Sequence, residues 1–270
     1  MSADLKRPVN GSAPARPATA CALAARGVVR SFGGVNAVDG VGLQVETGTV
    51  TGIIGPNGAG KSTFLNVLAG SLKPSSGSVF MGGRDVTGLA PHQRARRGLI
   101  RTYQISSEFR RLTVLENLLV AAPHQRGEQF RVLLLGKRWW RAQEAANHER
   151  AWELLSRFGL TDLANEYAGE LSGGQRRLVE IIRSLMADPK TLLLDEPMAG
   201  VNPTMARTVE RHLRELGQEG LTMVIVEHEL AVLGRLCERV VVMAEGRVIA
   251  DGEMAEVRAR PEVIEAYVVG

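Results

Sequence analysis

The stretch Gly55-Pro-Asn-Gly-Ala-Gly-Lys61-Ser62 decides the fold of this chain of 270 residues. It follows a short apolar run, Thr51-Gly-Ile-Ile54, which has the composition of a buried strand. After it, apolar residues recur at helical spacing up to Gly70. A strand, a glycine-rich loop and a helix in this order are the context of a phosphate-binding loop. The sequence therefore predicts an α/β fold with a P-loop NTPase core.

Each part of this loop has a chemical reason to bind phosphate. Without side chains, Gly55, Gly58 and Gly60 let backbone amides turn toward phosphate oxygens, and the following helix start adds a positive dipole end. The Lys61 ammonium is expected to reach the β- and γ-phosphates, and the Ser62 hydroxyl is expected to ligate Mg²⁺. The loop residues expected to bind ATP are Gly55, Asn57, Gly58, Gly60, Lys61, Ser62 and Thr63.

An acidic pair follows a second apolar run, in Leu192-Leu-Leu-Asp195-Glu196. Asp195 would leave the carboxyl end of a buried strand, where open α/β sheets bind their ligands, and its carboxylate can hold Mg²⁺ there. Glu196 is expected to be catalytic, by polarising the water that attacks the γ-phosphate. A plain pair of turn acids is the alternative, which the phosphate loop makes the weaker interpretation.

Apolar runs and helical patterns alternate along the rest of the chain. Short apolar runs within residues 27–54 predict strands, and further strands are expected at 191–194, 222–226 and 240–243. A helix is expected over about 204–216, and mostly helical sequence fills residues 91–185, where an apolar face at Ala151, Trp152, Leu154, Leu155 and Phe158 ends near Gly159. This alternation predicts a mainly parallel sheet with crossover helices and a helical insert.

A third motif, Leu171-Ser-Gly-Gly-Gln175, lies between the phosphate loop and the acidic pair. With it, the set of motifs resembles the ATP-binding subunits of ABC transporters, from about residue 23 to residue 270. The resemblance implies a nucleotide-binding domain over 22–270, with a small antiparallel β subdomain, a helical subdomain inserted at about 95–185 and a C-terminal tail helix at about 253–270. Residues 1–21, which lack periodicity, are expected to be a disordered tail.

The resemblance assigns a role to the third motif. Ser172, Gly173, Gly174 and Gln175 match the signature loop, which in this family contacts ATP held by the opposite subunit of a dimer. A hydroxyl, exposed amides and a helix start suit an anion. A plain helix-capping box would use the same residues and is the alternative.

Three single residues match further positions of the family. Gln104, in Arg101-Thr-Tyr-Gln104, matches the glutamine that contacts Mg²⁺ and water and links the ATP site to the transmembrane partner. His228, which follows a predicted strand, matches the histidine that hydrogen-bonds the γ-phosphate, and Phe32 lies where relatives stack an aromatic ring on adenine. A solvated glutamine, a structural histidine and a core phenylalanine are the alternatives.

One position departs from the family pattern. Many relatives have Ser-Ala-Leu-Asp after the acidic pair, whereas this chain has Ala199-Gly-Val-Asn202 followed by Pro203. Asn202 is predicted to cap the next helix, with Pro203 at its first position. The shape of the loop is then kept, while a charge that relatives direct across the dimer is lost.

Composition favours a soluble globular protein. The chain is 44% hydrophobic with a net charge of +4, and no apolar stretch approaches the roughly 18 to 20 residues that span a bilayer. Prolines and arginines interrupt the first residues where a secretory signal would be apolar, so the chain is expected in the cytoplasm. Cys21 and Cys237 have no metal-ligand spacing and no assigned role. The densest basic residues, interpreted as a solvated face rather than a partner contact, are Arg94, Arg96, Arg97, Arg101, Arg110 and Arg111.

Three segments make the chain similar to the ATPases of branched-chain amino-acid importers: 109–121, the insert 130–140 with Trp139-Trp140, and 260–270. Urea and amide importers share much of this pattern, and lipopolysaccharide-exporter ATPases share the Gly-Val-Asn-Pro run. A soluble ABC ATPase acting on nucleic acid is the alternative from another class, which the single cassette and the absence of heptads disfavour. The insert is interpreted as helical packing, with contact to a permease or to headgroups as the alternative.

The resemblance implies ATP and Mg²⁺ as cofactors and a peripheral place on the inner face of the cell membrane. The implied partners are transmembrane permease subunits, a second ATPase subunit in a homodimer or heterodimer and, indirectly, a substrate-binding protein. No nucleic acid is expected. The transported molecule cannot be read from this chain, because the residues that select it belong to the permease and the binding protein.

Overall fold

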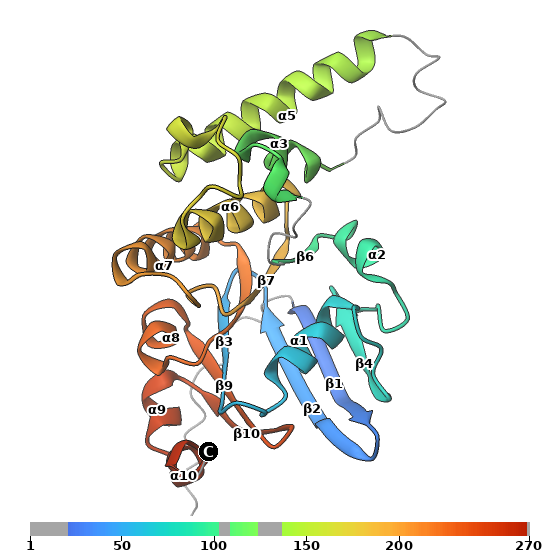
Figure 1. Ribbon diagram of the computed structural model, residues 1–270. Helices are drawn as coiled ribbons and strands as arrows, with labels where there is room; N and C mark the ends of the chain where they lie inside the picture. Colours follow the sequence, from blue (N-terminus) through green and yellow to red (C-terminus); the bar gives the residue numbers. More distant parts are fainter. Residues whose placement is uncertain (1–20, 103–108, 124–136, 269–270) are drawn as a thin grey trace, which may run out of the picture.

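A computed structural model describes residues 21–102, 109–123 and 137–268 (Figure 1). Within helix α5 (Lys137–Arg157), side chains are described from residue 141 onward. Gln104, the side chains of Trp139 and Trp140, and residues 1–20 of the expected tail therefore lie outside the described part of the chain. Cys21, the last residue of that expected tail, begins strand β1 (Cys21–Phe32).

The centre of the fold is a six-stranded, mainly parallel sheet, as predicted. From edge to edge its strands are β10 (Arg247–Gly252), β9 (Arg239–Ala244), β3 (Val50–Ile54), β8 (Thr222–Val226), β7 (Thr191–Asp195) and β6 (Leu99–Arg101). The neighbouring pairs from β9 to β6 are parallel, and the edge strand β10 is antiparallel to β9. Every residue of β3 and β8 is buried, because helices and the second sheet cover both faces.

A second, smaller sheet forms the antiparallel β subdomain. Its strands, in order, are β2 (Val35–Glu46), β1, β4 (Ser76–Met81) and β5 (Arg84–Asp85). Helix α1 (Lys61–Ala69) packs against both sheets, since its Phe64 and Leu65 share one hydrophobic core with Leu23 of β1 and Val224 of β8. The helix that follows the phosphate loop is thus held from two sides.

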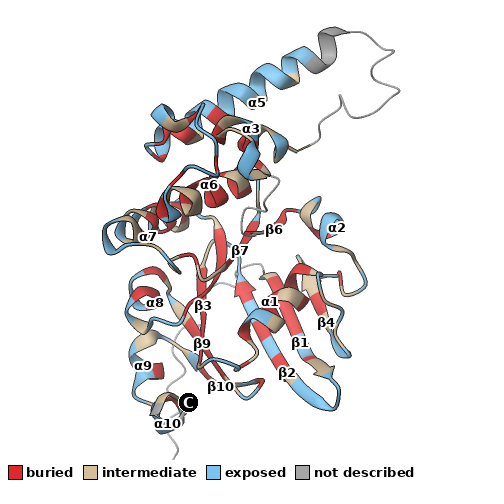
Figure 2. Ribbon diagram, viewed as in Figure 1, coloured by how far each residue is buried: buried red, intermediate tan, exposed pale blue. Residues whose placement is uncertain are grey.

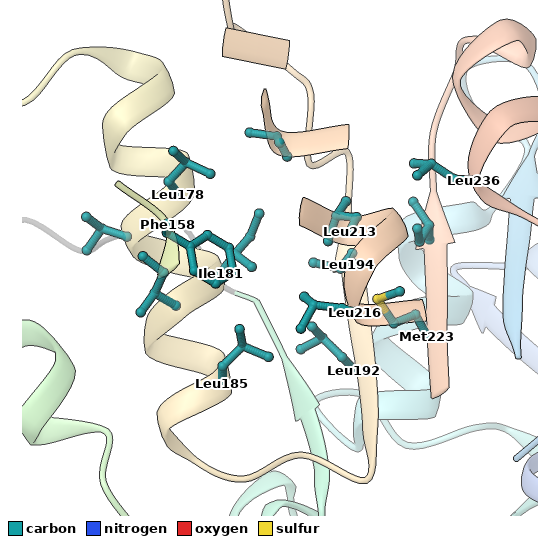
Figure 3. Close-up of a cluster of buried hydrophobic side chains, with 14 of the residues drawn as sticks. Phe158, Leu178, Ile181, Leu185, Leu192, Leu194, Leu213, Leu216, Met223 and Leu236 are labelled. Carbon is teal, nitrogen blue, oxygen red and sulfur yellow. The ribbon is translucent and has the colours of Figure 1, made fainter. Parts of the chain in front are cut away.

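The helical insert lies between β6 and β7 in the chain, in the upper part of Figure 1. It contains η1 (Phe109–Arg111), α3 (Val114–Val120), α5, η3 (Thr161–Leu163) and α6 (Gly173–Met186). Ile181 and Leu185 of α6 belong to one core with Leu192 and Leu194 of β7 and Leu213 of the next helix (Figure 3). The helical insert therefore shares its hydrophobic core with the central sheet.

Helix α5 has a narrower buried face than its sequence suggests. Ala151 and Leu155 are buried, but Trp152, which the predicted apolar face includes, is 39% exposed. One residue along a helix turns the side chain by about 100°, so Trp152 points away from the side that Ala151 buries. Most described residues of α5 before Ala151 are exposed (Figure 2). Of the helices in the part of the chain that the structure describes, none is both long and apolar enough to cross a bilayer.

The chain ends in short helices around β10. Helix α7 (Pro203–Gln218) precedes β8, as predicted, and α8 (Leu230–Leu236) precedes β9. The single tail helix expected at about 253–270 is instead two helices, α9 (Met254–Arg258) and α10 (Pro261–Val268). Proline lacks an amide hydrogen and disfavours helical angles in the residue before it, so Pro261 starts a new helix instead of extending α9.

Arg94, on α2 (Pro91–Ala95), is 1% exposed, so its assignment to a solvated basic face is wrong. Its guanidinium donates hydrogen bonds of 2.6–3.2 Å to the carbonyl oxygens of Val67, Leu68, Thr87 and Leu89. Two of these carbonyls belong to the last turn of α1, where helix acceptors have no partner within the helix. Arg94 therefore closes the far end of the helix that begins at the phosphate loop.

We expect Arg94→Met to lower the free energy of unfolding by about 3 kcal/mol, because it leaves several buried carbonyls without a charged donor. Urea denaturation followed by circular dichroism measures this change. The matched control is Arg97→Met, since Arg97 is exposed, and it should change stability by less than about 0.5 kcal/mol. Equal stability of the two variants would contradict the structural role of Arg94.

Candidate nucleotide-binding site

The phosphate loop lies in close contact with neighbouring strands near both of its ends. A Cβ on Gly55 would lie 1.9 Å from the carbonyl oxygen of Met243, and one on Gly60 would lie 2.1 Å from that of Ala37. Gly60 also has a φ of +92°, which side chains disfavour. Gly58, by contrast, has open space around it. Close contacts with β9 and β2 therefore fix both ends of the loop, and its middle has free space around it.

The first turn of α1 starts at this loop without a side-chain cap. Gly60 is the N-cap, and the first bond of the helix runs from Phe64 N to Gly60 O at 2.8 Å. The amides of Lys61, Ser62 and Thr63 precede that bond, and no acidic residue lies in this turn. Free amides and a positive helix end suit the oxygens of a phosphate.

Lys61 folds back across the loop. Its side chain is buried, and its ammonium donates to the carbonyl oxygens of Gly55 at 2.7 Å and Pro56 at 2.9 Å. Burial lowers the pKa of Lys61, while the negative charges of Glu196 and Asp195 raise it. The ammonium is thus held at the loop, where the negative charges of both carboxylates that the sequence singled out act on it.

Asp195 ends β7 and is partly exposed. Its Oδ2 accepts a hydrogen bond from Arg101 Nη2 at 2.9 Å, and Arg101 Nη1 donates to Asn66 Oδ1 of α1 at 2.6 Å. The Arg101 side chain is 9% exposed, so it belongs to this site and not to a solvated face. Arg101 therefore connects β6, α1 and the carboxylate at the end of β7.

Glu196 has an unusual backbone conformation. Its φ is +45°, a left-handed value that residues with a Cβ adopt at a cost of roughly 1–3 kcal/mol. Its amide donates to Val226 O of β8 at 2.9 Å, and its carbonyl oxygen accepts from Arg177 of α6 at 2.8 Å. Hydrogen bonds from two other elements thus hold this turn.

Glu227, directly after β8, is completely buried. One carboxylate oxygen accepts from the amide of Met198 at 2.9 Å, and the other accepts from the amide of His228 at 3.4 Å. Burial raises the pKa of Glu227, and these two hydrogen bonds oppose that shift. The His228 ring is 52% exposed, with Nδ1 at 3.6 Å from Glu227. Glu227 therefore joins the loop after Glu196 to the backbone that carries His228.

The signature residues begin α6. Ser172 Oγ accepts from the amide of Gln175 at 3.3 Å, while Gln175 Oε1 accepts from the amide of Ser172 at 2.9 Å. This is a capping box, so both side chains have a structural task in this conformation. A Cβ on Gly174 would lie 2.2 Å from Met205 of α7, and one on Gly173 would lie 3.2 Å from Gly200 O. The signature loop thus packs against the loop after the acidic pair.

Two further residues singled out in the sequence lie at the end of β1 and at the start of α7. Phe32 ends β1 with its ring 47% exposed, and the Arg30 guanidinium lies 4.6 Å from the ring centre. The ring is therefore not in the core, which was the alternative. Asn202 caps α7 through a hydrogen bond of 2.9 Å from the amide of Met205, with Pro203 at the first position. This confirms the predicted cap.

The structure thus gathers Lys61, Asp195 and Glu196 at one end of the parallel sheet, and Glu227 links the backbone of His228 to the loop that follows them. Sequence reasoning missed Arg101, Arg177 and Glu227, which bond to residues of this site. A weak signal existed for Glu227, since an acid directly after a wholly apolar strand sits where open sheets bind ligands. The two arginines carry no such signal, because their partners are far away in the sequence.

Comparison with known proteins agrees with this geometry. A family model described as "ABC transporter" matches residues 38–199, and one described as "Branched-chain amino acid ATP-binding cassette transporter" matches residues 247–268. The chain is 39% identical over 236 residues to the probable branched-chain amino acid transport ATP-binding protein LivG of Archaeoglobus fulgidus, covering 87% of this chain and 91% of that protein. It is 37% identical to the high-affinity LivG protein of Escherichia coli, covering 91% and 96%.

A solved structure leads to the same family. The ADP conformation of an ATP-binding cassette of an ABC transporter superposes with a TM-score of 0.81 at 40% sequence identity, covering 93% of this chain and all of that one. The chain therefore belongs to the ABC transporter family, as an ATP-binding subunit that hydrolyses ATP to power transport and works with transmembrane permease subunits. Within that family it is similar to the branched-chain amino acid transport ATP-binding proteins.

We expect the stability of the wild type to fall relative to Glu227→Gln as the pH rises. Because burial raises the pKa of Glu227, the native state keeps a proton that the unfolded state has already released. Stability therefore falls as the pH rises from the ordinary glutamate pKa through the raised one. Glutamine resembles the protonated form and does not titrate, so urea denaturation of both proteins from about pH 5 to about pH 8 measures this difference in slope.

The control for this pH series is Glu153→Gln, because Glu153 lies on the exposed side of α5. Its free energy of unfolding should follow that of the wild type at every pH. If the free energies of unfolding of the wild type and Glu227→Gln differ by the same amount at every pH, the raised pKa of Glu227 is contradicted. A difference that changes with pH agrees with the raised pKa, whatever its size at the lowest pH.

Proposed function

We propose that this chain is the ATP-hydrolysing subunit of an importer of branched-chain amino acids. The observation that carries the ATPase part is the Lys61 ammonium held on the phosphate loop, near enough to Asp195 and Glu196 for their negative charges to raise its pKa. The substrate rests on the relatives, which are named for branched-chain amino acid transport, and on the family match at residues 247–268.

In this proposal the phosphate loop binds the triphosphate of ATP. The uncapped amides of α1 and those of the loop receive the phosphate oxygens, and the Lys61 ammonium turns from its carbonyl partners to the β- and γ-phosphates. The phosphate-binding residues are Gly55, Asn57, Gly58, Gly60, Lys61, Ser62 and Thr63. Phe32 stacks on the adenine, which its exposed ring at the end of β1 permits.

The oxygen donors beside this loop fit Mg²⁺. The Ser62 hydroxyl is exposed, Asp195 is partly exposed at the strand end, and hydroxyl and carboxylate oxygens are ligands that Mg²⁺ prefers. Arg101 bonds to Oδ2 of Asp195, which leaves Oδ1 for the ion. We assign Ser62, Asp195 and Gln104 to the metal, with Gln104 lying outside the described residues. Bound Mg²⁺ would neutralise the charge that develops on the phosphates during transfer.

Hydrolysis is assigned to Glu196, with Gln104 and His228 beside the γ-phosphate. The Glu196 carboxylate takes the proton of the attacking water, and its backbone, held by β8 and α6, fixes the direction of that carboxylate. His228 donates to the γ-phosphate, and its exposed ring on a buried support is suited to this contact. Each of these residues acts only once the triphosphate lies across the loop.

The second half of the site is proposed to come from another subunit. Ser172, Gly173, Gly174 and Gln175 begin α6, whose positive end favours an anion of a facing molecule. Their described contacts are with one another, with α7 and with the loop after the acidic pair, which agrees with a role toward nucleotide held elsewhere. We infer a dimer with a second ATPase subunit, identical or different, docked on permeases at the inner face of the membrane and served by a substrate-binding protein.

Two substitutions separate binding from hydrolysis. Lys61→Ala should weaken ATP binding by about 100-fold, because it removes the main cation facing the phosphates. Glu196→Gln should bind ATP as the wild type does and turn over at least about 100-fold more slowly. Fluorescent-nucleotide titration and phosphate release measure the two effects, with the exposed Lys73→Ala as the control. Unchanged ATP binding by Lys61→Ala would refute the role of Lys61 in binding phosphate. Wild-type turnover by Glu196→Gln would refute the catalytic role of Glu196.

The partners and substrate are tested by isolating the complex. Tagged Glu196→Gln protein, held with ATP, is purified from detergent-solubilised membranes of the native host and its partners are identified by mass spectrometry. We expect two permeases and a second ATPase subunit, and the associated binding protein should bind leucine, isoleucine or valine in calorimetry. Binding of urea or an amide instead would replace the substrate, and recovery of nucleic acid or of soluble partners alone would refute the transport role.

A further inference from the structure

Arg177 lies on α6, one turn after the signature residues, and points into the protein. Its Nη1 contacts Glu180 Oε2 at 2.6 Å, and its Nη2 donates to the main-chain oxygen of Glu196 at 2.8 Å. The side chains of Arg177 and Glu180 are 11% and 8% exposed. One guanidinium thus joins the helix that carries the signature loop to the turn that carries the Glu196 carboxylate.

The backbone turn at Glu196 requires contacts with other elements to hold its conformation. Its left-handed φ of +45° is unfavourable for a residue with a side chain, so neighbouring contacts must hold it. The amide is held by Val226 O of β8 at 2.9 Å. The carbonyl oxygen receives the Arg177 guanidinium as well as the amide of Ala199 at 3.0 Å. Arg177 is therefore the charged donor at this turn and comes from the helical insert.

A pair of this kind is poorly explained as helix stabilisation alone. An exposed Arg–Glu pair three residues apart stabilises a helix by only a few tenths of a kcal/mol, whereas burying both charges costs more unless other hydrogen bonds repay it. The described bond to Glu196 O is such a hydrogen bond, and Glu180 sets the direction of the guanidinium toward it. The burial is thus accounted for by the contact between α6 and the Glu196 turn.

We propose that Arg177, oriented by Glu180, is a positioning residue that fixes the Glu196 carboxylate for hydrolysis and ties its direction to the placement of α6. This inference rests on the proposed catalytic role of Glu196. Because the same helix begins with Ser172 to Gln175, engagement of the signature loop by a facing nucleotide and the alignment of Glu196 in its own subunit become mechanically linked.

Loss of the Arg177 guanidinium should slow ATP turnover and leave ATP binding nearly unchanged. Arg177 has no described contact with the phosphate loop, so nucleotide affinity should stay within about twofold of the wild type in Arg177→Met. The maximal rate should fall by about 10-fold, as a small misplacement of a reacting group does. Arg177→Lys should recover part of this loss, because it keeps a cation and a donor. Glu180→Gln should lose less than Arg177→Met, since it keeps the guanidinium that donates to Glu196 O.

The experiment measures kcat and KM for ATP, and nucleotide affinity, in the transporter complex purified through a tag on this chain. The matched control is Arg157→Met, which removes the ion pair of 2.7 Å between Arg157 of the helical insert and Glu219 and has no described contact with Glu196. It should keep wild-type kcat. Thermal unfolding of each variant is measured alongside, and Glu180→Gln serves as the test if Arg177→Met does not fold.

A double substitution makes the test specific. If Arg177 acts through Glu196, Arg177→Met should cause no further loss of turnover in a Glu196→Gln background. The inference would be overturned by additive losses in the double variant or by an equal loss of turnover in Arg157→Met. It would also be overturned if the substitutions changed KM at constant kcat, or if both Arg177→Met and Glu180→Gln kept the wild-type kcat. Wild-type turnover by Glu196→Gln itself would instead overturn the proposed catalytic role, and an inactive Glu196→Gln beside a fully active Arg177→Met would overturn only the positioning role.

Discussion

The loop between β3 and α1 passes so close to its neighbours that two of its positions have no room for a Cβ. The obstacles at Gly55 and Gly60 are main-chain carbonyl oxygens of β9 and β2, which cannot move aside without disturbing a sheet. The path of this loop is therefore set by both sheets together, and with it the start of α1 and the return of Lys61 onto the carbonyl oxygens of the loop. The rest of the architecture keeps these two sheets and α1 in contact, through one shared hydrophobic core.

Buried ionisable side chains recur around this loop and along α1, and each is bonded to main-chain groups of another element. Arg94 closes the end of α1, Glu227 holds the amide of Met198, and Arg177 holds the carbonyl of Glu196. An unpaired buried charge would be strongly unfavourable, but hydrogen bonds to backbone groups of helix ends and turns offset that cost. The same bonds fix loops that hydrophobic contacts alone would hold loosely, because hydrophobic contacts are not directional. Charged side chains thus set the geometry at the loops, and apolar side chains set the arrangement of helices and strands.

Most strands and the main helices of the central sheet could be predicted, since continuous apolar runs mark strands covered on both faces and Asn202 with Pro203 marks the start of α7. The errors have physical causes. Arg94 and Arg101 are arginines in a basic stretch, which is usually a solvated face, but here the chain folds their guanidinium groups onto carbonyls and a carboxylate. Trp152 lies next to the buried Ala151 but one residue around the helix, and Pro261 divides the tail helix that the family resemblance implied.

By itself the sequence determined what depends on residues near one another in the chain: the glycine loop between a strand and a helix, an acidic pair at a strand end and an asparagine cap at Asn202. These features follow from local backbone geometry and from hydrogen bonds over a few residues. Only the tertiary structure decided which charges meet around the loop, since Arg101 and Asp195 are 94 residues apart, Met198 and Glu227 29, and Arg177 and Glu196 19. Those contacts depend on the order of strands in the sheet and on how α6 packs against β7, which arise only when the whole chain buries its apolar surface.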